Sequence, residues 1–107
     1  MMTAPLIIQQ GALTIDMERY LVSVRGQPVP MSYREYAVLV YLATHAGYVV
    51  TTRRLVEEGL GRHDVGGIGV VGELIRSLKG RLELNGERLI EQVPGEGYRF
   101  LPQVTSI

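Results

Sequence analysis

The chain of 107 residues lacks cysteine and tryptophan altogether and contains only one phenylalanine and one lysine. Without cysteine, the sequence excludes disulfide bonds, thiol nucleophiles and cysteine-ligated metals. Its longest apolar runs, such as residues 37–43, fall far short of the roughly 20 residues that a helix needs to span a bilayer. The N-terminus also lacks the charged segment and the apolar core of a signal peptide. We therefore expect a soluble protein of the cytoplasm, without a membrane partner.

An excess of charge of either sign is missing as well. The 11 basic and 11 acidic residues cancel, and the isoelectric point is about 6.7. This value is low for a nucleic-acid-binding domain, in which a basic face supplies most of the non-specific affinity. The charge on one face matters more than the sum, however, and all the cations except Lys79 are arginines. Arginine suits bidentate contacts to guanine and phosphate but is equally common in structural ion pairs, so composition alone decides nothing.

The sequence also shows no residues in the spacing of a catalytic or metal site. His63 and Asp64 form a single polar pair in a glycine-rich stretch, without a second histidine at ligand spacing. The glycines at 66, 67 and 69 are not followed by the Gly-Lys-Ser/Thr of a nucleotide-binding loop. We therefore predict no catalytic residue, no metal, no cofactor and no small-molecule substrate, and a function other than catalysis.

Alternating apolar and polar residues in the first thirty positions predict a small antiparallel sheet. Three strands are expected at Leu6–Ile8, Leu13–Asp16 and Tyr20–Val24, with turns at 17–19 and 25–28 and a brief fourth strand at Val29–Met31.

Three helices are predicted after this sheet. Ser32-Tyr33-Arg34-Glu35 is a capping box, so the first helix should run from about Tyr33 to His45. Thr51 or Thr52 should cap a short second helix from Arg53 to about Gly59. The third helix should begin at Gly69 or Val70 and end at Leu82. The expected core positions are Tyr36, Leu39, Val40 and Ala43 in the first helix and Val71, Ile75, Leu78 and Leu82 in the third.

The C-terminal stretch predicts a tight hairpin. Gly95 and Gly97 flank one residue between two strands, which are expected at Leu89–Val93 and Tyr98–Leu101. A helix followed by such a hairpin is typical of a winged helix. The predicted fold class is α+β: a winged helix-turn-helix with an N-terminal antiparallel sheet, three helices and a C-terminal wing. The whole chain, 1–107, is expected to form one domain with its core at about 11–102.

This order of elements resembles the OmpR/PhoB-type DNA-binding domain, the output domain of bacterial two-component response regulators. Four segments carry the resemblance: 31–36, 47–55, 75–79, and Gly95-Glu96-Gly97-Tyr98-Arg99-Phe100, the most specific. It implies that the third helix enters the major groove of double-stranded DNA and that the wing reaches the neighbouring minor groove. It also implies that the second helix and the loop after it contact phosphates or RNA polymerase, and that two copies bind head to tail.

Carried over residue by residue, the resemblance assigns two sets of DNA contacts. The predicted base contacts are Arg76, Lys79, Ser77 and Gly72, and the predicted phosphate contacts are Arg53, Arg54, Thr52, Arg62 and Arg99. Against this, Arg76 has Glu73 and Glu83 within reach as surface ion-pair partners, and Arg99 has acidic neighbours.

Several positions depart from the family pattern. Gly69, Leu74, Ser77 and Pro94 stand where the family commonly has arginine or another polar residue, and Glu73 and Glu96 add carboxylates. The alternative interpretation is therefore a winged helix that binds a protein partner instead of DNA. An exposed Leu74 would support it, because apolar anchors suit protein contacts.

Overall fold

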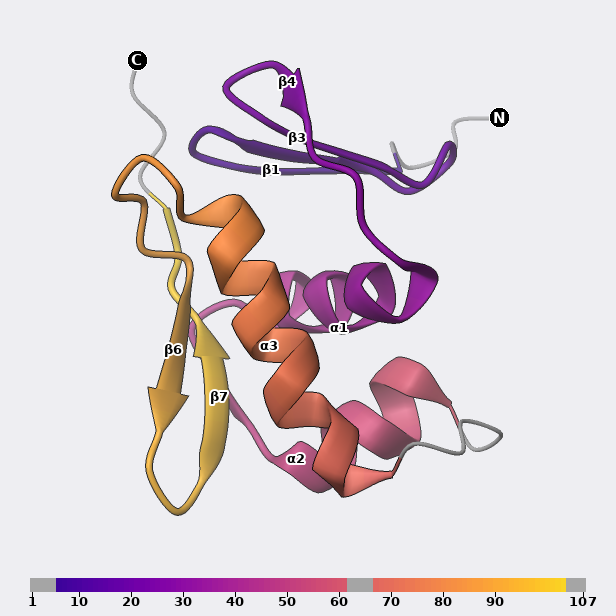
Figure 1. The fold of residues 1–107 in the computed structure, drawn as a ribbon, viewed down its shortest axis with the longest axis vertical. Coiled ribbons are helices and arrows are strands. Elements are labelled where there is room, and N and C mark those ends of the chain that lie inside the picture. Colours follow the sequence, from indigo (N-terminus) through magenta and orange to yellow (C-terminus); the bar gives the residue numbers. More distant parts are fainter. Residues whose placement is uncertain (1–5, 62–66, 104–107) are drawn as a thin grey trace, which may run out of the picture.

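The computed structural model describes residues 6–61 and 67–103 (Figure 1). The elements follow in the order β1 (Ile7–Gln10), β2 (Leu13–Asp16), β3 (Leu21–Val24), β4 (Gln27–Pro28), α1 (Tyr33–Thr44), β5 (Val49–Val50), α2 (Thr52–Arg54), η1 (Leu55–Leu60), α3 (Ile68–Leu82), β6 (Ile90–Val93) and β7 (Gly97–Phe100). The N-terminal sheet lies on one side of α1, and the β6–β7 hairpin extends beside α3.

The N-terminal sheet is antiparallel throughout, with its strands in the order β1-β2-β3-β4. Alternation directs Leu13, Ile15, Val22 and Val24 into the core, as the sequence pattern predicts. The predicted fourth strand at Val29–Met31 was wrong: β4 is Gln27–Pro28. The reason is the turn, because Arg25 and Gly26 both adopt positive φ, 53° and 79°, and close a two-residue hairpin that starts pairing earlier.

Helix α1 begins as predicted. The Ser32 hydroxyl accepts a hydrogen bond from the Glu35 amide, and the Glu35 carboxylate accepts one from the Ser32 amide, so both bonds of the capping box form. The buried face is wider than predicted. It adds Val38 and Leu42, whereas Val40 is only half-buried, because α1 packs against several elements: β1, η1, α3 and β7.

The second helix starts at Thr52 with Thr51 as its cap, whose hydroxyl accepts from the Arg54 amide at 3.1 Å. After one turn it widens into the π-helical segment η1, which ends at Gly61. The sequence pattern did not predict this widening. Leu55 at the junction is fully buried, so the widened turn is anchored on the core.

The wing is part of a three-stranded sheet in the order β5-β7-β6. The hairpin strands were predicted to within one residue at each end, but β5 was not predicted. With only two residues, Val49 and Val50, β5 is too short to show a periodic pattern. It connects the wing to the start of α2, and Phe100 of β7 is fully buried beside it in the common core.

Candidate nucleic-acid interface

Helix α3 has a buried side and an open side. Val71, Ile75, Leu78 and Leu82 are buried, as predicted, which leaves the opposite side to solvent. Along that open side lie Gly69, Glu73, Arg76 and Gly80, at intervals of four, three and four residues. Two glycines therefore flank one acidic and one basic side chain on the exposed face.

Arg76 and Lys79 form no ion pair or hydrogen bond with the residues that the structure describes. The surface pairs with Glu73 and Glu83 do not form. Glu83 instead accepts hydrogen bonds from the amides of Leu89 and Ile90, at 2.8 and 3.0 Å. Arg76 and Lys79 are therefore available to a ligand, unlike Arg81, the third cation of α3, which pairs with Glu35.

A groove separates α3 from the wing. It is lined by Gly72, Ile75, Arg76, Lys79, Gln92 and Tyr98. Gln92 and Tyr98 face each other across the hairpin that runs beside α3 in Figure 1. A Cβ at position 72 would lie 3.9 Å from the Tyr98 hydroxyl, so the glycine keeps this part of the groove open.

The groove brings together three predicted residues, Gly72, Arg76 and Lys79, and adds two, Gln92 and Tyr98, that sequence reasoning did not assign to the interface. From the sequence, Tyr98 was expected as the start of the second hairpin strand. It does pack against the core, but its ring is only half-buried and its other side lines the groove. The sequence does not show the register of the hairpin, which pairs Tyr98 with Gln92 beside the groove.

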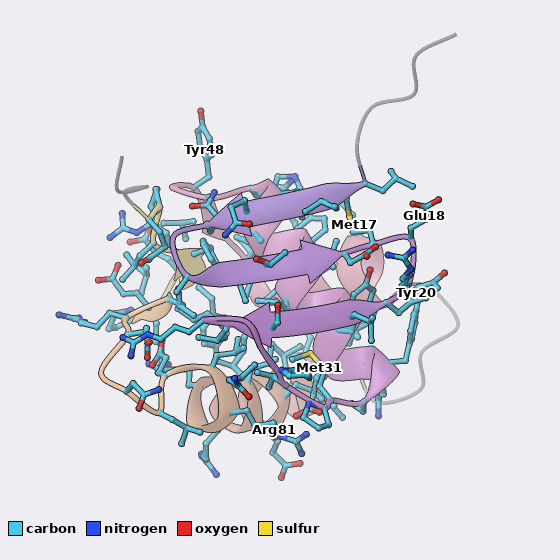
Figure 2. All side chains as sticks on the ribbon, turned by 90° about the horizontal axis from the view of Figure 1, so that it is seen from above. Met17, Glu18, Tyr20, Met31, Tyr48 and Arg81 are labelled. Carbon is cyan, nitrogen blue, oxygen red and sulfur yellow. The ribbon has the colours of Figure 1, made fainter. Side chains whose placement is uncertain are left out.

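Ser77, a predicted base contact, is turned toward α1 instead. Its hydroxyl donates to the buried Glu35 carboxylate, whose other oxygen lies 3.7 Å from the Arg81 guanidinium. Arg81 also donates to the Pro30 carbonyl at 2.6 Å, and Figure 2 shows it on α3, next to the N-terminal sheet in that view. The Ser77 hydroxyl is therefore already bonded inside the protein, and its contact with a DNA base stays a prediction.

Glu35 is held in its ionised form. Burial alone would raise the pKa of this carboxyl, but hydrogen bonds from Ser77 and Ser32, together with the charge of Arg81, outweigh burial and hold the pKa below its ordinary value. The carboxylate therefore joins the start of α1 to α3 and fixes the position of α3 against α1.

The predicted phosphate contacts also divide into side chains without a partner among the described residues and side chains already bonded within the fold. Arg53 is exposed at the start of α2 and has no partner within residues 6–61 and 67–103. Arg54, in contrast, donates to the Tyr41 hydroxyl at 2.9 Å and pairs with Glu58 at 3.5 Å. Arg99 pairs with Glu91, the residue opposite it on β6. Arg54 and Arg99 are thus bound within the fold, which argues against both assignments.

Thr52, the fourth of these residues, is half-buried at the start of α2 and lines a depression between α2 and the wing. Arg62, and with it the His63–Asp64 pair, lies outside the described residues. Leu74 is half-buried and packs against the core. It therefore does not supply the exposed apolar anchor that the protein-binding alternative requires.

An exposed helix with a β-hairpin beside it, seated on two further helices and a sheet, defines the winged helix-turn-helix class, as predicted. The family model "Transcriptional regulatory protein, C terminal" matches residues 26–100. The chain belongs to this family, the OmpR/PhoB-type DNA-binding domains of transcriptional regulators.

Relatives and solved structures agree with this membership. The two-component response regulator PhoP of Pseudomonas aeruginosa is 34% identical over 94 residues, which cover 87% of this chain and 42% of PhoP. The sensory transduction protein RegX3 of Mycolicibacterium smegmatis is 27% identical over 96 residues, 88% of this chain and 42% of RegX3. The chain thus spans about two fifths of these relatives.

Among solved structures, the DNA-binding domain of Klebsiella pneumoniae RstA in complex with the RstA box has a TM-score of 0.78 at 31% identity, covering 91% of this chain and 98% of that domain. The response regulator DrrB of Thermotoga maritima has a TM-score of 0.77 at 30% identity, with 89% and 44% covered. Within the described ranges, every helix is too short or too polar to cross a membrane.

Proposed function

We propose that this chain regulates transcription by binding a specific sequence of double-stranded DNA through α3 and the wing. The observation that supports this most strongly is the open side of α3, where Arg76 and Lys79 have no partner within the described residues and border a groove against the wing. Arginine in the major groove donates two hydrogen bonds to guanine, the commonest specific contact between protein and DNA. The RstA domain, which has the same fold, was solved bound to its DNA box.

The residue roles in this proposal follow from position and available charge. Arg76 reads a base and Lys79 contacts a base or phosphate nearby, while Gly72 allows the helix backbone to approach. Arg53 and Thr52 contact the phosphate backbone from the start of α2. Arg62 keeps its assignment as a phosphate contact, made from the sequence alone. Ser77 lies on the side of α3 that faces α1, and its hydrogen bond to Glu35 orients α3.

The wider roles are part of the same proposal. The names of PhoP and RegX3 support a role as the output domain of a two-component response regulator, working in the cytoplasm. Two copies bind head to tail on repeated half-sites, and the segment after α2 contacts RNA polymerase. Glu57 and Glu58 of η1 are exposed on that segment and offer an acidic surface to a protein partner.

Selection from a pool of random duplexes, repeated at two salt concentrations, tests the proposal. We expect an enriched half-site and a steep loss of affinity at the higher salt, because each phosphate contact releases a counterion. A folded domain that enriches no sequence and does not bind even at low salt would contradict the proposal. That outcome would favour the protein-binding alternative.

A further inference from the structure

The open side of α3 presents the two cations Arg76 and Lys79 and one acidic side chain, that of Glu73. Glu73 is exposed and forms no ion pair or hydrogen bond with the residues described in the structure. Other carboxylates of the chain are used: Glu35 caps α1, Glu58 and Glu91 pair with arginines, and Glu83 binds backbone amides. The carboxylate of Glu73 has no such structural role.

The spacing along α3 places this carboxylate on its exposed face, between Gly69 and Arg76. Gly69 precedes Glu73 by four residues and Gly80 follows Arg76 by four, and a Cβ at either glycine would meet nothing within 4 Å. The helix surface is therefore low on both sides of the Glu73–Arg76 pair. If α3 enters the major groove, these two side chains are the first to reach the base edges.

A carboxylate among phosphates lowers affinity for DNA in general, so it contributes only where it finds a hydrogen-bond donor. In the major groove, cytosine presents its N4 amino group as a donor with no acceptor beside it. Adenine presents its N6 amino group next to the N7 acceptor, and guanine and thymine present acceptors, which repel a carboxylate. Such an unfavourable element against wrong sequences is a common source of specificity. The chemistry of Glu73 therefore matches cytosine.

Resting on the proposed DNA-binding function, we propose that Glu73 is a specificity-determining residue that accepts a hydrogen bond from a cytosine. Three residues along a helix correspond to about 4.5 Å, close to the roughly 3.4 Å between base pairs. The cytosine therefore lies at the base pair next to the guanine that Arg76 reads.

The test is selection from random duplexes with the wild type, Glu73→Ala and Glu73→Gln, and with Glu18→Gln as a control. Glu18 is an exposed carboxylate in the turn between β2 and β3, away from α3 (Figure 2). The wild type should enrich cytosine beside the guanine. Glu73→Ala should lose that preference by about five- to a hundredfold, the range of one good base contact, and bind random DNA more tightly. Glu73→Gln should shift the preference to adenine, which a glutamine amide recognises. Glu18→Gln should select the wild-type sequence.

The outcomes separate this proposal from the one on which it rests. If all four proteins select one identical sequence and Glu73→Ala only binds every duplex more tightly, Glu73 is a solvated carboxylate and the inference is wrong, while DNA binding stands. If the folded wild type enriches no sequence at all, both proposals are overturned. Circular dichroism establishes that each variant is folded, which is expected because Glu73 forms no hydrogen bond or ion pair with residues 6–61 and 67–103.

Discussion

At the scale of the residue, the cations that the structure describes fall into two groups: those that pair with an acidic residue of the fold and those that do not. Arg54 and Arg99 were predicted as DNA contacts together with Arg53, Arg76 and Lys79, because a sequence shows where arginines occur and not what they touch. The structure separates the two kinds through the partners Glu58 and Glu91. A basic residue that pairs across strands or along a helix cannot be recognised before the register is known.

Arg76→Ala should weaken binding to the selected duplex by about 1–3 kcal/mol and relax the preference at one base position. The reason is the loss of a bidentate contact to one base. Dissociation constants for the selected duplex and for its single-base variants measure the effect. An equal loss on the selected and on random duplexes would assign Arg76 to the phosphates instead.

Arg53→Ala should weaken binding to every sequence alike and reduce the slope of log affinity against log salt by about one, since one phosphate contact is lost. Arg19→Ala is the matched control, because Arg19 pairs with Asp16 in the turn after β2 and should leave the slope unchanged. A variant at position 53 that alters the preferred sequence would contradict the phosphate assignment.

Gly97→Ala should destabilise the domain severely, by about 3 kcal/mol or more. Gly97 adopts a φ of 145°, and a Cβ there would lie 2.1 Å from the Val50 carbonyl oxygen of β5. Gly80→Ala is the contrasting variant: its site is open, and alanine in a helix should stabilise by up to about 1 kcal/mol. Urea denaturation measures both. A Gly97→Ala protein as stable as the wild type would show that β5 does not approach the wing this closely.

At the scale of the element, the hydrogen bond between Glu35 of α1 and Ser77 of α3 holds α3, the helix proposed to read DNA, against α1. The Ser-x-x-Glu pattern predicted only the capping box that Glu35 also forms, because both partners are three residues apart. The bond with Ser77 joins Glu35 to a residue 42 positions further on, and no local pattern predicts a contact at that distance. For the same reason the sequence could not show that the Ser77 hydroxyl is bonded to Glu35.

Glu35→Ala should lower the free energy of unfolding by about 2–4 kcal/mol, because it removes a cap and leaves Ser77 and Arg81 without their partner. The pH dependence gives a second readout. The folded pKa of Glu35 is depressed, so its stabilisation is complete above the unfolded pKa of about 4.3 and is lost as the pH falls through the folded pKa. Between pH 5 and pH 3, the wild type should therefore lose more stability than Glu35→Gln. Parallel curves for the two proteins would contradict the depressed pKa.

Most elements could be predicted because their signals are local: alternation in the N-terminal strands, the cap of α1, the stripe of α3 and the glycines of the wing. Three features could not. The strand β5 has only two residues, the π-helical turn η1 depends on how Leu55 meets the core, and β4 depends on the left-handed turn at Arg25 and Gly26. Each is decided by backbone geometry that composition and periodicity do not show.

At the scale of the whole molecule, the neutral net charge is compatible with DNA binding. Many charges cancel in ion pairs within the fold, and other cations stay exposed at the surface. Acidic residues neutralise arginines within the fold at several places, including Glu87 with Arg25 and Glu91 with Arg99. Of the cations left over in the described part of the chain, Arg76 and Lys79 line the groove against the wing, and Arg53 is exposed at the start of α2. The low isoelectric point therefore reflects ion pairs within this domain and does not argue against a DNA ligand.

The most direct test of this account is a titration of the isotopically labelled domain with its selected duplex, followed through the backbone amide resonances. We predict that the largest shifts map to the open side of α3, to the wing turn at 94–96 and to the start of α2, while the outward strands of the N-terminal sheet change little. Shifts concentrated on the N-terminal sheet, with α3 and the wing unaffected, would contradict the assignment of the interface.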